Sequence, residues 1–215
     1  MDVLPLSKRL RAATAEAHRT AERHSFVVAL LRGEVTAARY AEHLSSLLLV
    51  YETLESALTP PCHPALVPVA DPAMFRTEAI RADLAVLGGV TDPSPAARRW
   101  AEHLQRLQET SPLGLVGHIY TRYLGDLSGG QQIGRRLVST GCLPAEAVAS
   151  YRFDGIDDIS AFKDDFRTAL DQIGAEGGEA VCADIVVEAR RAFEWSGALF
   201  EAVSPAAPTR SAPGG

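Results

Sequence analysis

One histidine near the N-terminus has neighbours that suit it to bind a metal ion. Arg11, Thr14, His18 and Glu22 follow one another at spacings of three, four and four residues, so on a helix they share one stripe. His18 can bind a metal through one ring nitrogen while Glu22 accepts the proton of the other, an arrangement common in metal-bound histidines. Arg11, about 10 Å earlier along the helix axis, can meet an anionic group at the edge of a ligand. A partly buried histidine paired with Glu22 is the competing interpretation.

A second chemical feature is the glycine-rich segment GLVGHIYTRYLGDLSGGQQIGRRL. Each glycine inside a helix costs about 1 kcal/mol relative to alanine, so these glycines must serve a purpose. Gly125 and Gly129 share one helix face, where missing side chains let a flat ligand approach the backbone and permit a bend. Close helix packing is the alternative purpose. Asp126 beside them would organise water or protons if it lies in a pocket, and would otherwise be a solvated carboxylate. The six glycines are Gly114, Gly117, Gly125, Gly129, Gly130 and Gly134.

Two other clusters compete for a functional role. Lys163 and Arg167 are four residues apart and can clamp a carboxylate, although two solvated charges beside neighbouring aspartates explain them equally well. His118 lies seven residues before Gly125, so spacing does not exclude it as a metal ligand. The remaining histidines form no HxxxH or HExxH pair, and a multi-histidine zinc or iron site is therefore unsupported. These histidines are His24, His43, His63 and His103.

The elements that must position these residues are helices. Apolar residues recur at spacings of three and four, beginning with Leu6, Leu10, Ala13, Ala17 and Ala21. The proline-rich stretch TPPCHPALVPVADP interrupts the pattern. We predict a single all-α domain with a long helix through the glycine segment. The other predicted helices are 35–58, 72–87, 96–109, a short helix after Pro144, 156–173 and 179–203.

Length and composition limit the class of protein. The 215 residues carry a net charge of −6, which argues against a general nucleic-acid binder. Three widely spaced cysteines, Cys62, Cys142 and Cys182, are expected to be reduced thiols. No signal core or apolar run long enough to span a bilayer is visible, so we expect a cytoplasmic protein without a membrane partner. We predict a folded domain over 1–203 and a disordered, proline-rich tail over 204–215.

Two segments of the chain resemble haem oxygenase, and the similarity continues at lower density from about Leu6 to Phe200. The first is YTRYLGDLSGGQ (Tyr120 to Gln131), a specific glycine motif. The second is ATAEAHRTAE, which contains His18. The resemblance implies an all-α fold that clamps haem between a proximal helix and a kinked distal helix. It also implies oxidative cleavage of haem at the α-meso carbon, yielding biliverdin, carbon monoxide and Fe²⁺ from dioxygen (O2) and external electrons.

The resemblance also implies roles for individual residues. His18 would be the proximal ligand of the haem iron, with Glu22 as its hydrogen-bond partner. Gly125, Gly129 and Gly130 would lie against the porphyrin. Asp126 would organise the distal water, with contributions from Tyr51 and Arg122. Family members carry a histidine at the position of His118 without using it as a ligand. Residues that would contact the haem propionates or edge are Arg11, Tyr120, Lys163, Arg167 and Phe193.

Haem b would be both substrate and cofactor, and the sequence has no signature for bound flavin or NAD. Electrons would come from a ferredoxin or flavodoxin-type donor with its reductase, for which Lys8, Arg9, Arg11 and Arg19 form a possible docking surface. Ala15 stands where some members carry a propionate-binding lysine, which leaves the orientation of the haem open. A haem carrier or sensor is the main alternative. A thiaminase-like or quinone-cofactor synthesis enzyme of similar shape is a third.

Overall fold

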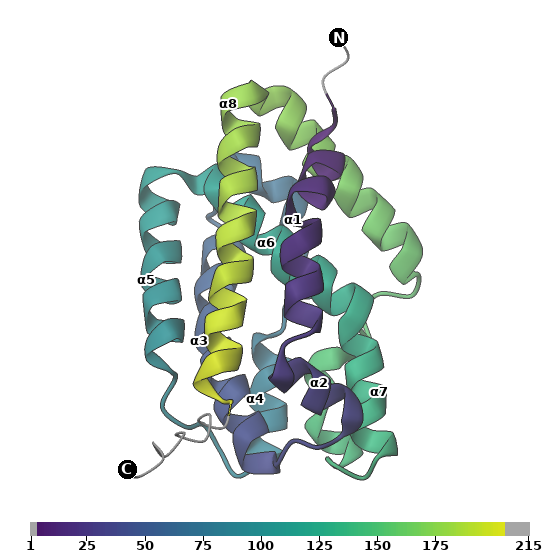
Figure 1. Ribbon diagram of the computed structural model, residues 1–215. Coiled ribbons are helices and arrows are strands. Elements are labelled where there is room, and N and C mark those ends of the chain that lie inside the picture. Colours follow the sequence, from purple (N-terminus) through teal and green to yellow (C-terminus); the bar gives the residue numbers. More distant parts are fainter. Residues whose placement is uncertain (1–3, 205–215) are drawn as a thin grey trace, which may run out of the picture.

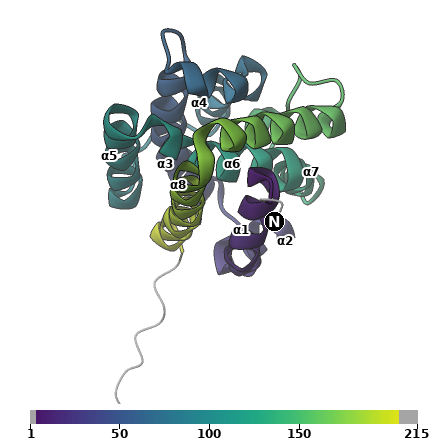
Figure 2. The same ribbon diagram turned by 90° about the horizontal axis from the view of Figure 1, so that it is seen from above.

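The computed structural model describes residues 4–204, which form helices and irregular connections without any strand. Figure 1 shows α1 lying beside the second half of α8, with α5 at the left, α3 and α4 behind, and α6 and α7 continuing from one another. Figure 2 shows the first half of α8 crossing over α6 toward α7. The α-helices are α1 (Leu6–Glu22), α2 (Ser25–Arg32), α3 (Ala37–Leu58), α4 (Thr77–Val86), α5 (Pro95–Thr110), α6 (Leu115–Gly125), α7 (Gln131–Ser139) and α8 (Ile159–Ala202).

Local sequence signals set several helix boundaries. Thr36 caps α3 because its hydroxyl accepts a hydrogen bond from the backbone N–H of Arg39. Ser94 caps α5 in the same way, and Pro95 occupies the first helical position, where no backbone N–H is needed. Gly33 ends α2 with a left-handed φ of 68°. The predicted boundaries of α3 and α5 are therefore confirmed to within two residues.

The core is built mainly on α3, which is buried along most of its length. Trp100, Leu104 and Leu107 of α5 point inward as predicted. On α1 the prediction was partly wrong, because Leu6, Leu10 and Thr14 are buried while the alanines of the predicted stripe are only half-buried.

Three other features differ from the expectations, and a fourth expectation is untested. Helix α2 was missed, because a short apolar segment gives little periodicity. The helix predicted over 72–87 starts only at Thr77, after a 3-10 turn at Pro72–Met74. The helix expected after Pro144 is two 3-10 turns, Ala145–Ala147 and Ala149–Tyr151. Of the predicted tail over 204–215, all but Ser204 lies outside the described residues.

The last two predicted helices form one long element, α8, with a break at Gly178. This glycine has φ 74° and ψ −173°, a conformation that only glycine adopts easily. The break lies between the two predicted helices, and it lets the second half of α8 turn back along α1 (Figure 1).

The glycine segment is helical, as predicted, but it is not a uniform α-helix. Between α6 and α7 the chain forms a π-helical turn, Asp126–Gly130. A π turn inserts one extra residue into the hydrogen-bonded ladder and is a common cause of a kink. It places Asp126, Gly129 and Gly130 on one irregular turn.

Candidate functional site

A cavity of about 410 Å³ lies between α1 and the second half of α8 on one side and the α6–α7 segment on the other. Its wall is mostly apolar, with a few polar side chains gathered from distant parts of the chain. Such a combination is typical of a site for a small organic ligand or cofactor. The predicted site residues on its wall are His18, Glu22, Tyr51, Arg122, Gly125, Asp126, Gly129, Gly130 and Phe193.

His18 borders the cavity from α1, with its side chain 55% exposed. Its Nδ1 atom lies 3.5 Å from Oε1 of Glu22, and its ring meets Phe193 edge to face with the centroids 6.0 Å apart. With Nδ1 turned toward the carboxylate, Nε2 remains to bind a metal. Neutral imidazole nitrogen is a common ligand of iron and zinc.

Tyr51, Arg122 and Asp126 form a polar cluster on the cavity wall. The Tyr51 hydroxyl donates to Oδ2 of Asp126 and accepts hydrogen bonds from Nε and Nη2 of Arg122, at 3.2 and 3.0 Å. Nη2 of Arg122 also lies 3.3 Å from Oδ1 of Asp126. Burial raises the pKa of Tyr51 well above its usual value. Burial lowers the pKa of Arg122, but Tyr51 and Asp126 more than compensate, so both groups keep their protons.

The six glycines of this segment divide into two groups. A Cβ atom built on Gly125 or Gly129 would meet nothing within 4 Å, because both face open space at the cavity. A Cβ on Gly130 or Gly134 would instead lie 3.1 or 2.8 Å from the Tyr151 side chain. A Cβ on Gly117 would lie 2.5 Å from backbone atoms of α8. A Cβ on Gly114 would lie 3.1 Å from the Leu107 side chain. Gly125 and Gly129 thus leave room for a ligand, whereas the other four serve packing.

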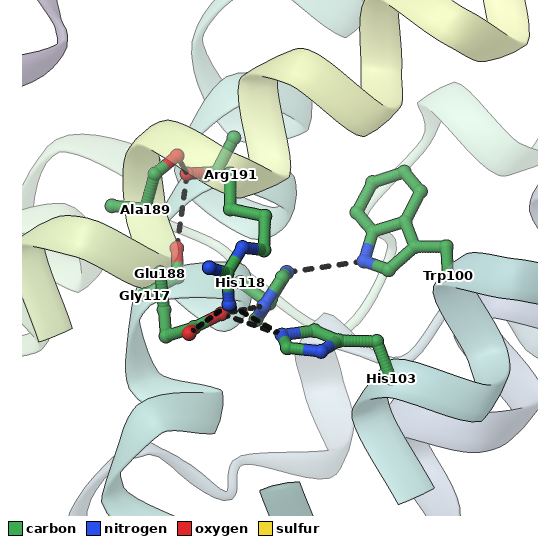
Figure 3. Close-up of polar contacts among 8 residues, drawn as sticks. Trp100, His103, Gly117, His118, Glu188, Ala189 and Arg191 are labelled. Carbon is green, nitrogen blue, oxygen red and sulfur yellow. Dashed lines mark hydrogen bonds and ion pairs between the residues drawn. The ribbon is translucent and has the colours of Figure 1, made fainter. Parts of the chain in front are cut away.

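His118 does not compete as a ligand in this cavity, because neighbours occupy both ring nitrogens (Figure 3). The indole N–H of Trp100 donates to Nδ1 at 3.0 Å, so the proton is on Nε2 and points to Glu188 Oε2, also 3.0 Å away. Burial lowers the pKa of His118 and keeps the ring neutral. His118 is therefore a core residue that joins α5, α6 and α8.

The same neighbourhood brings His103, His118 and Glu188 close enough to resemble a metal site. However, the Nε2 proton of His118 cannot be lost while Trp100 donates to Nδ1, and the Arg191 guanidinium lies 2.6 Å from Glu188 Oε1. A second cation beside that arginine would be repelled. These residues therefore form a hydrogen-bonded cross-link between helices (Figure 3).

Four predicted propionate contacts do not line the cavity. Arg11 and Arg167 are exposed, and Arg167 pairs with Asp164 at 2.5 Å. Lys163 and Tyr120 are half-buried.

His43 and Tyr151 are among the cavity residues that the sequence did not single out. His43 of α3 lines the wall but belongs to no recognisable metal motif. Its spacing from Leu47 and Tyr51, at i, i+4 and i+8, is the signal that places all three on one helix face. Tyr151 lies in an irregular segment far along the chain, where no periodic pattern points to it.

Across the described residues, no helix is long and apolar enough to cross a membrane.

The family described as "Heme oxygenase" matches residues 4–202. A haem oxygenase from Guillardia theta is 34% identical over 206 residues, covering 91% of this chain and 85% of the relative. The structure of haem oxygenase-1 from Synechocystis in complex with haem superposes with a TM-score of 0.86 at 31% identity, covering 92% and 91% of the two chains. The haem oxygenase structure from Leptospira interrogans gives 0.85 at 31% identity, covering 92% and 98%. With the family matched over almost the whole folded region, the chain belongs to the haem oxygenases.

Proposed function

We propose that this haem oxygenase binds haem b in the cavity and cleaves it at the α-meso carbon, releasing biliverdin, carbon monoxide and Fe²⁺. The observation that supports this most directly is that a histidine and two side-chain-free helix positions border the same cavity. His18 offers Nε2 from α1, while Gly125 and Gly129 offer bare backbone with no atom in the place of a Cβ.

The residues present suit a flat, largely apolar ligand with one metal atom. His18 would bind the iron, and Glu22 would hold the imidazole through Nδ1, which raises its basicity. Phe193 would pack against the edge of the ring beside His18. Bound haem supplies an iron that activates dioxygen and the porphyrin carbon that is oxidised, while the imidazole donates less electron density than the thiolate of other haem enzymes.

On the other side of the cavity, the protein would hold water and protons without placing an acid or a base directly beside the bound dioxygen. Gly125 and Gly129 present no acid or base. Asp126 holds the Tyr51 hydroxyl proton in a hydrogen bond, and Arg122 fixes both partners. A carboxylate restrained in this way can deliver protons through ordered water at a defined place.

The contacts at the rim and the electron donor are parts of the same proposal. The haem propionates would protrude from the cavity, and the side chains turned toward them would be Arg11, Tyr120, Lys163 and Arg167.

Electrons would come from a ferredoxin or flavodoxin-type protein, and dioxygen from solution. Of the proposed docking residues, Lys8 and Arg19 are exposed, whereas Arg9 is held by both carboxylate oxygens of Glu179 at 2.6 and 2.7 Å.

A haem carrier or sensor is the second candidate, since it would use His18 equally well. The test mixes the purified protein with hemin, adds a reductant under air, and records the visible spectrum while carbon monoxide is trapped. We expect the Soret band to disappear, a broad far-red absorbing product to grow, and carbon monoxide to form. A stable Soret band that merely shifts would indicate a carrier.

Asp126→Ala sharpens the distinction between enzyme and carrier. In an oxygenase it should bind hemin but lose product formation, whereas a carrier would be indifferent to it. Asp154→Ala, an exposed aspartate outside this cavity, is the matched control. Failure of the unchanged protein to bind hemin would refute both functions.

A further inference from the structure

We propose that Arg76 and Asp83 are positioning residues that act through Tyr151. Together they form a backbone clamp that fixes the chain around this tyrosine, and the tyrosine ring then supports the π-helical turn that carries Asp126. The proposal deepens the function given above and rests on it. Two buried charges whose hydrogen bonds all go to the backbone are the observation behind it.

Asp83 of α4 holds the start of a short irregular segment. The residue is completely buried, with 0% of its surface exposed. Its Oδ1 accepts the backbone N–H of Ala149 at 2.6 Å, and its Oδ2 accepts that of Ser150 at 2.9 Å. These are the first two residues of the 3-10 turn Ala149–Tyr151, whose first N–H groups have no partner within the turn.

Arg76, the residue just before α4, holds the other end of that turn. Only 6% of it is exposed. Its Nη1 donates to the carbonyl oxygens of Arg152 and Ser150, the latter at 3.4 Å. Its Nε donates to the carbonyl of Met74 at 2.8 Å, and Nη2 donates to that of Ala73 at 3.2 Å. The guanidinium therefore ties the end of the turn to the segment that precedes α4.

Neither charge forms an ion pair among residues 4–204, although a buried charge without compensation is costly. Backbone N–H groups compensate the carboxylate, while carbonyl groups and the ring of Phe153, 3.9 Å from Cζ, compensate the guanidinium. Apolar side chains would fill the same space without that cost. The charges are therefore best explained by the strong hydrogen bonds with which they fix the backbone.

Tyr151 lies between the backbone groups that the clamp holds, and its ring contacts the glycine segment. A Cβ atom built on Gly134 would lie 2.8 Å from Cβ of Tyr151. One built on Gly130 would lie 3.1 Å from Cδ1 of Tyr151 and 3.8 Å from Cβ of Asp126. The tyrosine ring and Asp126 thus meet at the same glycine of the π-helical turn.

The π-helical turn needs such support, because glycines weaken a helix and a π turn interrupts its regular hydrogen bonding. Open space lies at Gly125 and Gly129. Asp126 itself is joined to Tyr51 and Arg122 only through side chains. Movement of the Tyr151 ring would therefore let the turn shift, and the carboxylate of Asp126 with it.

Two substitutions in the full chain test the clamp. Asp83→Asn and Arg76→Lys each keep a polar side chain but remove at least one hydrogen bond to the backbone. One matched control is Asp71→Asn, at an exposed aspartate that accepts the backbone N–H of Ala73 in a neighbouring 3-10 turn. The other is Arg81→Lys, at an exposed arginine of α4.

Amide hydrogen exchange of the unliganded proteins measures local opening of the turn. In both clamp variants, exchange over residues 126–134 should become roughly tenfold faster or more, the usual effect of losing a hydrogen bond to a charged group. Exchange in α5 should keep its rate, and the two controls should match the unchanged protein throughout. Equal acceleration in α5 would indicate a general loss of stability, and unchanged exchange over 126–134 would show that the clamp and the turn are not coupled. Either result would overturn the proposal.

Two variants of Tyr151 separate the ring from the clamp. Tyr151→Leu removes the ring but leaves the backbone contacts, and it should accelerate exchange over 126–134 as the clamp variants do. Tyr151→Phe keeps the ring and should exchange like the unchanged protein. Unaltered exchange in Tyr151→Leu would show that the ring does not support the turn. These two variants decide the question even if Asp83→Asn does not fold.

With hemin bound, Arg76→Lys should slow single-turnover ring opening roughly tenfold, because Asp126 occupies its place for a smaller fraction of the time. It should also shift the pH midpoint of the acid–alkaline spectral transition of the ferric complex, which a general loss of stability would leave in place. An unchanged rate and midpoint beside faster exchange would mean that the clamp only stabilises the fold. The exchange measurements involve no haem, so their failure is distinguishable from failure of the proposed function.

Discussion

The ring of Tyr151 occupies the volume that a side chain at Gly134 would need. A Cβ atom built on Gly134 would lie 2.8 Å from Cβ of Tyr151, and one on Gly130 would lie 3.1 Å from its ring. At Gly125 and Gly129 the corresponding space is open and belongs to the cavity. Some glycines of this short segment thus allow close packing, whereas others leave space in the cavity. Alanine substitutions should separate these two roles.

Alanine substitutions in this segment should have opposite effects on folding and on ligand binding. Gly129→Ala removes backbone freedom in a helix and meets no atom, so unliganded protein should become more stable by about 0.5–1 kcal/mol. The added methyl group should obstruct hemin. Gly134→Ala should instead destabilise the fold by about 1–3 kcal/mol through overpacking against Tyr151.

Thermal unfolding and hemin titration of the two variants check this prediction. Each kcal/mol corresponds to a change of about 2–4 °C in the unfolding temperature for a chain of this size. Equal loss of stability in both variants would show that Gly129 also serves packing.

His18 and Glu22 should contribute unequally to hemin binding. His18→Ala removes the proposed iron ligand, and added imidazole should restore the spectrum by occupying the vacated position. Glu22→Gln keeps an acceptor near Nδ1 but removes the charge, and should weaken binding roughly 10- to 100-fold. Hemin titration measures both changes, with Glu16→Gln, an exposed glutamate on the same helix, as control. Undiminished binding by His18→Ala would exclude it as the ligand.

The hydroxyl of Tyr51 should matter for the rate of ring opening more than for hemin affinity. Tyr51→Phe removes one hydrogen bond to Asp126 and the acceptor for Arg122, so the carboxylate is less restrained. Single-turnover rates should fall roughly tenfold or more, the usual value of a hydrogen bond to a charged group. Tyr123→Phe is the comparison, since it removes an equally buried hydroxyl that donates to Glu55. A similar decrease in rate in both variants would assign the effect to packing.

The cross-link at Glu188 should make the fold sensitive to acid. Burial raises the pKa of Glu188, but hydrogen bonds from His118 and His103 lower it to about 2. A carboxyl whose folded pKa is depressed stabilises the fold above its unfolded pKa, and that contribution is lost as the pH falls from about 5 to 2. Urea unfolding at a series of pH values should show Glu188→Gln less stable at pH 7, with a flatter curve below pH 5. Parallel curves for both proteins would contradict this assignment.

A basic surface on α1 should receive the electron donor. Lys8 is exposed and, unlike Arg9, forms no ion pair with an acidic side chain of the described residues 4–204. Lys8→Glu should therefore raise the apparent KM for a reduced ferredoxin, more strongly at low salt. Steady-state kinetics would measure this, with Arg99→Glu, at an exposed arginine of α5, as the control. An unchanged KM would rule out this surface.

Helical periodicity predicted most of the fold, because long amphipathic helices repeat their pattern many times. It missed α2, which has only eight residues, and it merged the 3-10 turn at Pro72–Met74 with α4. The starts of α3 and α5 are set locally, by the hydrogen bonds that the Thr36 and Ser94 side chains accept from the backbone. Helix boundaries that depend on interactions between neighbouring residues can therefore be read from the sequence.

The site was predictable only where its residues form a motif. His18 with Glu22, and Gly125 with Gly129, could be paired by spacing alone. Spacing could not separate Gly129 from Gly130, because the difference lies in Tyr151, a contact made through tertiary structure. The burial of His43 could not be predicted for the same reason, because its ring packs against Phe26 and Phe200 from other helices.

One wall of the cavity joins the two ends of the chain, since α1 and the second half of α8 meet at His18 and Phe193. A ribosome adding about 5–20 residues per second completes α1 long before the end of α8 exists. Until α8 has been made, the face of α1 that carries His18 therefore lacks the helix against which it packs. In the proposed function haem contacts both α1 and α8, so it can be bound between them only after α8 has been synthesised.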